Sequence, residues 1–239
     1  MHRGWVLAVA LWPTSAWAAD YIVNSNADAG AGTLRDAVDV LNGDPGGAPH
    51  RITFALGGPS TIELQSPLPY LNVATTIDGI DGSAASCQPR GTPHQLEVMV
   101  RAVYGTDDGI LRSIAPLTVR GLALVGFQDE AIILQGASDS RIQCSYFGAQ
   151  LDGLTAEGAE GNKAILLLEG GDLPSDVVIG TDGDGIDDEQ EWNLFAASQV
   201  AIELRGPDPA FDPRAGGTGV VIAGNLFGLA LNLEQDSVG

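Results

Sequence analysis

The sequence has few cysteines, few basic residues and few aromatic side chains, and each shortage excludes a class of protein. Two cysteines in 239 residues are too few for a disulfide scaffold. They show no CxxC spacing, and three histidines in the whole chain argue against a zinc site. Eleven Lys and Arg stand against 31 Asp and Glu, so the net charge is 11 − 31 = −20. Such an acidic surface repels nucleic acid and anionic lipid, and we expect neither as a partner.

Long apolar runs are also scarce, and the run at the N-terminus is too short to cross a bilayer. A short basic start and an apolar run over residues 4–12 are followed by Pro13 and by a small-x-small pattern at residues 16–18. The sequence therefore predicts a signal peptide over residues 1–18 and an exported protein, either secreted or at the cell surface. After cleavage we expect no transmembrane segment and a charge of 10 − 31 = −21.

One short helix is expected in residues 19–46, after an extended stretch at residues 21–23. Thr33 is a favourable N-cap, and Asp36 follows three residues later in a capping-box arrangement. Gly43 is expected to end the helix. An apolar stripe at helical spacing is formed by Leu34, Ala37, Val38 and Leu41. We expect this amphipathic helix to cover the open end of a hydrophobic stack.

Residues 47–239 are expected to contain only short strands, separated by turns rich in Gly, Asp, Ser and Pro. The expected strands cover residues 51–56, 61–65, 75–78, 96–103, 117–125, 131–134, 141–147, 164–168, 176–179, 200–204 and 219–223.

Internal repetition decides the fold prediction. An apolar segment at residues 131–136 recurs at 164–170 and at 201–206. A second segment, centred on an aromatic residue, occurs at 146–148, 193–196 and 225–228, and a leading strand occurs at 141–142, 176–179 and 218–222. Stacked repeats tolerate variable turn lengths, whereas a sandwich needs tight hairpins that are scarce here. The sequence therefore predicts an all-β fold, a right-handed parallel β-helix with a short N-terminal capping α-helix.

The N-terminal part resembles the CSLREA-type family of exported bacterial β-helix repeat proteins. Residues 33–38 read Thr-Leu-Arg-Asp-Ala-Val where that family has Ser-Leu-Arg-Glu-Ala-Ile, and Gly32 replaces the family's cysteine. Similar segments follow at residues 52–54, 61–64, 68–71 and 76–79, and later at 179–185 and 193–195. The resemblance spans most of residues 21–228. It implies the fold and export, and it carries no catalytic residue across.

An acidic, glycine-rich loop at residues 182–189 is the best candidate for a metal site. Calcium takes six to eight oxygen ligands, which alternate carboxylates on such a loop can supply. The alternative is a solvated turn, since Asp and Gly are good turn formers. The predicted calcium ligands are Asp182, Asp184, Asp187 and Asp188.

No catalytic residue is predicted. The adjacent carboxylates Asp107-Asp108 and Asp187-Asp188 would point to opposite faces of a strand, so neither pair forms a glycosidase dyad by itself. The Gly-His-Gly and Arg-x-Lys segments expected of β-helix pectinases are also missing.

Two further predictions concern the segment around residues 86–94. A disulfide between Cys87 and Cys144 is allowed, because an exported chain meets oxidising conditions and a long loop carrying Cys87 can fold back along the rungs, and two free thiols are the alternative. His94, in the same Pro- and Gly-rich insertion, lies either in a binding loop or in a plain surface loop.

The sequence thus predicts a secreted or surface-displayed repeat protein with a structural, adhesive or ligand-presenting role, and with glycans or other surface proteins as partners. The alternative is a polysaccharide-active enzyme, a lyase or hydrolase of the pectinase kind. The repeat is still running at residue 233, so we also expect the stack to be incomplete at the C-terminus.

Overall fold

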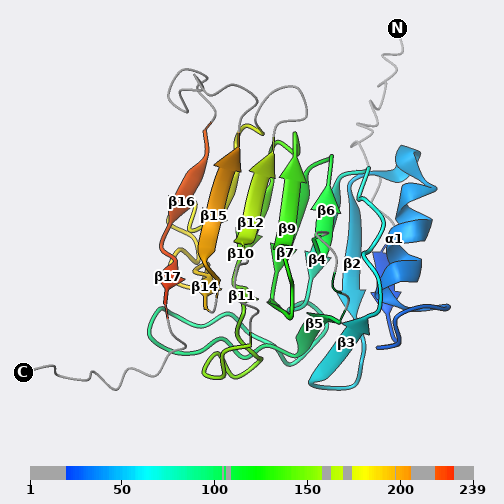
Figure 1. Cartoon of the computed structure of the whole chain (residues 1–239), viewed down its shortest axis with the longest axis horizontal. Helices are drawn as coiled ribbons and strands as arrows, with labels where there is room; N and C mark the ends of the chain where they lie inside the picture. The colour runs from blue at the N-terminus through cyan, green and yellow to red at the C-terminus, as the bar shows by residue number, and fades with distance from the viewer. Residues whose placement is uncertain are drawn as a thin grey trace, which may run out of the picture.

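The computed structural model describes residues 20–103, 105, 109–157, 163–168, 174–196, 198–205 and 219–228. These residues form mainly parallel β-sheet, together with one α-helix (Figure 1). The expected signal peptide, the pair Asp107-Asp108 and the expected incomplete C-terminal end lie outside the described residues. Within the described part, no helix has the length and apolar character needed to cross a membrane.

Three sheets, called A, B and C here, make up the molecule. Sheet A contains β1 (Asp20–Val23), β2 (His50–Phe54), β4 (Thr75–Asp78), β7 (Leu117–Arg120), β10 (Arg141–Gln143), β13 (Val178–Gly180) and β16 (Val221–Ala223). Sheet B contains β3 (Ser60–Leu64), β5 (Val98–Ala102), β8 (Leu122–Val125), β11 (Tyr146–Phe147), β14 (Leu194–Phe195) and β17 (Leu226–Phe227). Sheet C contains β6 (Leu111–Ser113), β9 (Glu130–Gln135), β12 (Lys163–Leu168) and β15 (Val200–Arg205).

From β4 onward, successive strands visit the sheets in the order A, B, C. Each group of three, for example β7, β8 and β9, is called a rung here. Every strand pairs in parallel with the strand of the same sheet one rung away. The first rung reaches sheet C through Leu71, which bridges to Ser113 of β6. Parallel pairing at a fixed step therefore extends through the described chain.

Most expected strands differ from the observed ones by one or two residues at an end, but two of them are each divided into two strands, and the reason is the corner between sheets A and B. The stretch expected as one strand over 117–125 is divided into β7 and β8 at Gly121, and the stretch over 141–147 is divided into β10 and β11 at Cys144. Gly121 has φ +75°, where an L side chain is disfavoured, and the chain bends there from one sheet to the next. The short strands β6, β14 and β17 were not among the expected strands.

The core is a set of ladders in which equivalent residues stack from rung to rung. In sheet A the ladder is fully buried and consists of Ile52, Ile77, Val119, Ile142 and Ile179. In sheet B, Phe147 stacks on Phe195 with ring centroids 4.8 Å apart, and Phe195 stacks on Phe227 at 5.2 Å. Exposure rises in the last rung, to 42% at Ile222 and 59% at Phe227. Strands that are apolar on one face align because the alternation of side chains fixes the register.

Asparagine side chains hold the corner between sheets A and B in the later rungs. Asn193 donates from Nδ2 to the carbonyl of Ile142 at 2.8 Å, and its Oδ1 accepts from the backbone of Ser145 at 3.0 Å. Asn225 repeats the first bond one rung on, to Ile179 at 2.8 Å. These bonds satisfy backbone groups that the bend leaves without sheet partners, and they explain why asparagine precedes both Leu-Phe segments.

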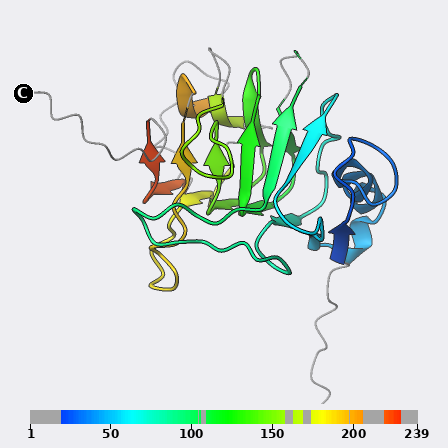
Figure 2. The same cartoon turned by 90° about the horizontal axis from the view of Figure 1, so that it is seen from below.

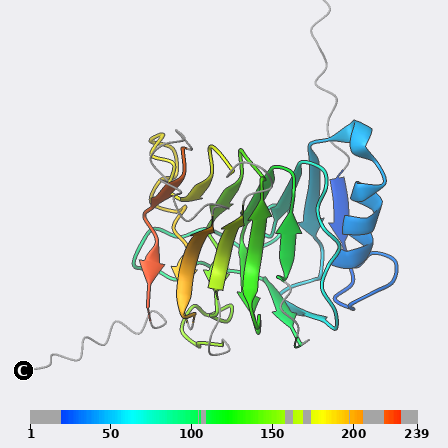
Figure 3. The ribbon, with the colours of Figure 1, turned by 45° about the horizontal axis from the view of Figure 1, so that its top comes forward.

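The helix α1 (Leu34–Asn42) lies at the N-terminal end of the sheets (Figure 3). Its limits agree with the prediction: Thr33 is the N-cap, its side chain accepts from Asp36 N at 3.2 Å, and Gly43 is the C-cap. The four residues of the predicted apolar stripe are buried and belong to the main core cluster. A short 3-10 helix, Pro45–Gly47, then leads into β2. The amphipathic pattern therefore identified both the helix and its buried face.

Candidate functional site

The largest departure from the repeating pattern is the segment of residues 79–97 between β4 and β5, called the strap here. Figures 1 and 2 show it in blue-green, running lengthwise past the later rungs toward β14 and β17. Its two arms are joined by an antiparallel bridge between Ser86 and Gln95. Its far end is held where Arg90 N donates to the carbonyl of Glu189 at 3.0 Å. The strap thus brings residues of the second rung to the fifth.

Beneath the strap lies a second apolar cluster, outside the rungs. The strap covers the outer face of sheet B, where Tyr146 and Leu194 point away from the main core. His94 stacks against two aromatic rings, with centroid distances of 3.8 Å to Trp192 and 5.5 Å to Tyr146, and the centroids of these two rings are 6.1 Å apart. The buried members of this strap cluster are Leu96, Met99, Ala123, Val125, Cys144, Tyr146, Ala149, Trp192, Leu194 and Ala196.

The His94 side chain is buried and neutral, so it is not itself exposed to a ligand, and the choice between a binding loop and a plain surface loop for its segment stays a prediction. Its Nδ1 accepts from the backbone N–H of Gln88 at 2.8 Å. Its Nε2 therefore carries the proton and donates to the carbonyl of Trp192 at 2.9 Å. Burial lowers the pKa of His94 to about 4. The imidazole is a structural link between the strap and the fifth rung.

Cys87 and Cys144 are joined by a disulfide in this structure, with their Cα atoms 5.7 Å apart. Cys87 belongs to the strap, and Cys144 lies at the corner between β10 and β11. Close by, the indole Nε1 of Trp192 donates to the carbonyl of Gln88 at 2.7 Å. The strap is therefore held by one covalent bond, one histidine and one tryptophan.

A polar trough runs between the strap and the outer face of sheet A. It consists of two hollows of about 450 and about 300 Å³, which share Ile80 and Arg120 as lining residues. The larger is lined by Arg51, Asp78, Ile80, Asp81, Gly82, Ser83 and Arg120. The smaller is lined by Ile80, Ser86, Cys87, Arg120, Gln143, Asp187, Gln190 and Glu191. The two hollows are therefore adjacent, and together they are called the trough here.

Charged side chains line the trough, and they differ in how far they are already paired. Arg51 contacts Asp78 at 2.8 Å and Asp81 at 2.6 Å, and the hydrogen bond with Asp78 raises the pKa of Arg51. The Asp78 carboxylate is 4% exposed and also accepts from the backbone of Ile80 at 2.9 Å. Arg120 lies 3.8 Å from Asp78 and is 43% exposed. Asp78 is thus a fixed anchor, whereas Arg120 is available to a ligand.

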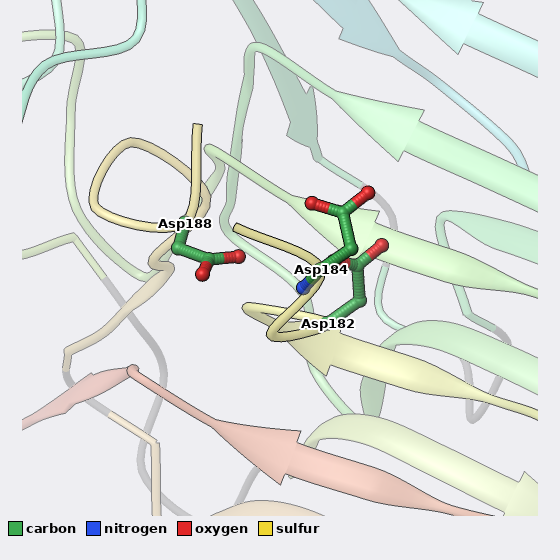
Figure 4. A group of neighbouring side chains, drawn as sticks. All are labelled: Asp182, Asp184 and Asp188. Atoms are coloured by element: carbon green, nitrogen blue, oxygen red, sulfur yellow. The ribbon is translucent and has the colours of Figure 1, made fainter. Parts of the chain in front are cut away.

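The acidic loop, residues 181–191, closes the far end of the trough. Figure 4 shows Asp182 and Asp184 side by side, with Asp188 facing them from the other arm of the loop. One ligand oxygen from each of the three lies within 4.8 Å of the others. Their carboxylates also accept hydrogen bonds within the loop: Asp182 from Asp184 N, Asp184 from Ile186 N, and Asp188 from Gly185 N.

The fourth predicted calcium ligand, Asp187, does not belong to this group. It has φ +57° and lines the smaller hollow of the trough instead. Glu191, which sequence reasoning did not single out, accepts from Asp182 N at 3.1 Å. Burial raises the pKa of Glu191 above its ordinary value. The acidic loop therefore presents three converging carboxylates to one side and two further carboxylates to the trough.

Lys163, the only lysine of the chain, forms a separate charged group at the start of β12. Its Nζ lies 3.1 Å from Glu130, 3.5 Å from Asp129 and 3.4 Å from Glu203. The Glu130 side chain is 3% exposed, and burial raises its pKa to about 7 in spite of the lysine. This group stabilises neighbouring rungs of sheet C and has no hollow beside it among those described above.

Sequence reasoning missed the trough residues Asp78, Arg120 and Gln143. Each follows a buried residue in an alternating strand, so its outward direction could have been predicted. Their alignment across strands could not, because the loops between the rungs differ in length. The register places Asp78 opposite Arg120, and Arg120 opposite Gln143.

No known family's sequence profile matches the chain, and no curated protein matches it either. The site must therefore be interpreted from its own geometry.

Proposed function

We propose that this protein is an exported, right-handed parallel β-helix that presents the polar trough to a ligand, in a structural or adhesive role at or beyond the cell surface. The trough is the observation that carries the proposal. It is lined from several rungs, it is walled by a disulfide-linked insertion, and it holds an Arg120 side chain that is partly exposed. Insertions on a rigid repeat scaffold are the usual place for binding residues.

The β-helix assignment is supported by the A, B, C order of the strands and by the helix packed against β1 at the start of the stack. Export is supported by the N-terminal three-part pattern and by the resemblance of residues 33–38 to the CSLREA-type opening. Glycans and other surface proteins are the ligands that this location offers.

A screen of the mature chain against arrayed glycans and peptides tests the proposal. We expect a ligand whose binding Arg120→Ala weakens by about tenfold or more, because hydrogen bonds from a charged group are lost. The matched control is Arg141→Ala, since Arg141 lies on the same sheet but lines neither hollow. Binding that both variants leave unchanged, or that both weaken equally, would contradict the trough as the ligand site.

A polysaccharide-active enzyme is the second candidate, and Glu191 is the observation that favours it. A general acid needs a raised pKa, and burial shifts Glu191 in that direction at the edge of the trough. Assays for new reducing ends and unsaturated uronates on each bound glycan test this candidate. Turnover that is lost in Glu191→Gln would support it, and binding without turnover would leave the ligand-presenting role.

We also propose calcium as the ion for Asp182, Asp184 and Asp188. Three hard oxygen donors within 4.8 Å, exposed or half-buried on a glycine-rich loop, suit calcium better than a transition metal. The ion would neutralise carboxylates that otherwise repel one another.

A further inference from the structure

The lining of the trough advances one rung at a time along the stack. Arg51 belongs to β2, Asp78 to β4, Arg120 to β7 and Gln143 to β10, which are neighbours in sheet A. Glu191 follows β13, the next strand. Asp78, Arg120 and Gln143 are in register. Arg51 is opposite Thr76 and reaches Asp78 through its side chain, and Glu191 comes from the loop after β13. This uneven row of lining residues therefore draws on five neighbouring rungs.

The length of this row sets the kind of ligand it can hold. Parallel strands lie about 4.8 Å apart, so four steps from β2 to β13 span about 19 Å. A compact metabolite would fill only part of this length. A linear oligomer fills it, and the best match is an oligomer whose repeat is close to one strand spacing. A pyranose chain linked through opposite ring carbons has that repeat, whereas an extended peptide advances only about 3.3 Å per residue.

The chemistry of the lining also fits a sugar chain. Carboxylate, guanidinium and amide groups form two parallel hydrogen bonds with paired groups, and neighbouring hydroxyls of a sugar ring are such a pair. Arg120 and Asp81 have exposed side chains that can make these bonds, with exposed fractions of 43% and 58%. Ile80 lines both hollows and offers an apolar contact for the C–H face of a ring.

Charge decides between neutral and anionic chains. The trough lining holds two guanidinium groups, Arg51 and Arg120, against four carboxylates, those of Asp78, Asp81, Asp187 and Glu191. The whole chain adds a net charge of −20. An oligouronate would therefore be repelled both locally and at long range, and a neutral chain would not.

We propose that the trough binds a linear, neutral oligosaccharide that lies along the stack with one sugar unit per rung. This inference rests on the ligand-presenting role proposed above and assigns it a ligand class. The ligand contacts Arg120 at the centre, and Asp81 and Glu191 toward the two ends.

Calorimetric titration of the mature chain with neutral β-1,4-linked gluco- and manno-oligosaccharides of about two to six units tests the proposal. Affinity should rise with each added unit up to about five and then level off, because the lining residues draw on five rungs over about 19 Å. Arg120→Ala should weaken binding by about tenfold or more. Arg141→Ala should bind like the unchanged protein, and an oligouronate of equal length should bind at least about tenfold more weakly.

Several outcomes would overturn this inference. They are an affinity that does not depend on chain length, an oligouronate that binds more tightly than the neutral chain, and an equal effect of the two arginine variants. An extended Ser/Asn peptide that binds in an Arg120-dependent manner would also overturn it, although the trough would then remain a ligand-presenting site. Failure of the oligosaccharide class is in this way separated from failure of the proposed function.

Discussion

The two apolar clusters of the molecule are built on different principles. The main core repeats the same contact in rung after rung, as in the sheet A ladder from Ile52 to Ile179. The strap cluster makes each of its contacts once, through the His94–Trp192 stack and the bond between Cys87 and Cys144. The main core can be extended by adding rungs that repeat the same contacts. In the strap cluster no contact is repeated, so the loss of any one residue removes a contact that no other residue supplies.

This difference bears on function because the trough lies at the junction of the two clusters. Its floor comes from rungs that are stabilised by many equivalent neighbours, whereas its wall comes from a segment held at a few points. Elements with few contacts open locally at lower free energy than the core. The wall can therefore change while the floor stays fixed, and four predictions separate these two parts.

Loss of a core ring should have the largest effect. Phe147 is fully buried and stacks on Phe195 at 4.8 Å. Phe147→Ala should lower the free energy of unfolding by about 3–5 kcal/mol, because it removes apolar contacts and leaves a cavity. The measurement is denaturant unfolding followed by circular dichroism.

Phe227→Ala is the matched control, since Phe227 occupies the same ladder but is 59% exposed. Its cost should be below about 1 kcal/mol. Equal costs for the two variants would show that the ladder is not the source of stability.

The same contrast explains what could be predicted from the sequence. The alternating strands, the helix over residues 34–41 and the recurrence of the apolar segments all follow from local periodicity, which reports the face that each element buries. The boundaries at Gly121 and Cys144 were missed because a corner between two sheets interrupts no apolar pattern.

The trough was missed for a different reason. Asp78 and Arg120 become neighbours only through the register of β4 and β7, which are separated by 38 residues (79–116) that include β5 and β6. His94 and Trp192 meet across a separation of 98 residues, and no repeat relates them. A contact that occurs only once leaves no periodic pattern in the sequence. The contact between the strap and the segment that carries Trp192 can therefore be found only from the structure.

Removing the disulfide should loosen the wall and spare the floor. The cross-link closes 57 residues, for which the chain-entropy relation gives about 4 kcal/mol at 25 °C as an upper figure. In the Cys87→Ala/Cys144→Ala variant, hydrogen exchange should accelerate in residues 79–97 while β2, β4 and β7 keep their protection. A uniform acceleration through all of these strands would show that the strap and the rungs unfold as one unit.

Lowering the pH should also change the stability contributed by the strap and by the rungs in opposite directions. Burial lowers the pKa of His94 from an ordinary 6.5 to about 4. Its contribution to the free energy of unfolding is therefore fully present above pH 6.5 and is lost as the pH falls toward 4. The loss amounts to about 3 kcal/mol at most. Glu130, in sheet C, has its pKa raised to about 7 from 4.5, so its contribution is present below pH 4.5 and is lost as the pH rises toward 7.

Unfolding free energies of the unchanged protein, His94→Gln and Glu130→Gln, measured from pH 4 to pH 7, separate the two contributions. The advantage of the unchanged protein over His94→Gln should grow with pH, and its advantage over Glu130→Gln should shrink. Parallel curves for all three proteins would mean that neither side chain titrates differently in the folded state.

Calcium should have the smallest effect, and it should be confined to the acidic loop. The carboxylates of Asp182, Asp184 and Asp188 already accept backbone and side-chain hydrogen bonds, so the loop is closed without an ion, and what an ion adds is relief of repulsion among three charges. A ligand that binds only the folded state stabilises it by RT ln(1 + [L]/Kd), which is about 1.4 kcal/mol at tenfold excess over Kd. Thermal unfolding in calcium, in magnesium and in chelator at equal ionic strength should therefore show a small increase in Tm that is specific to calcium.

Asp184→Asn should abolish the increase while Asp187→Asn keeps it, because Asp187 lies outside the converging group. If both variants behave like the unchanged protein, or if magnesium has the same effect as calcium, the three carboxylates form a solvated turn and the trough does not depend on an ion at its far end.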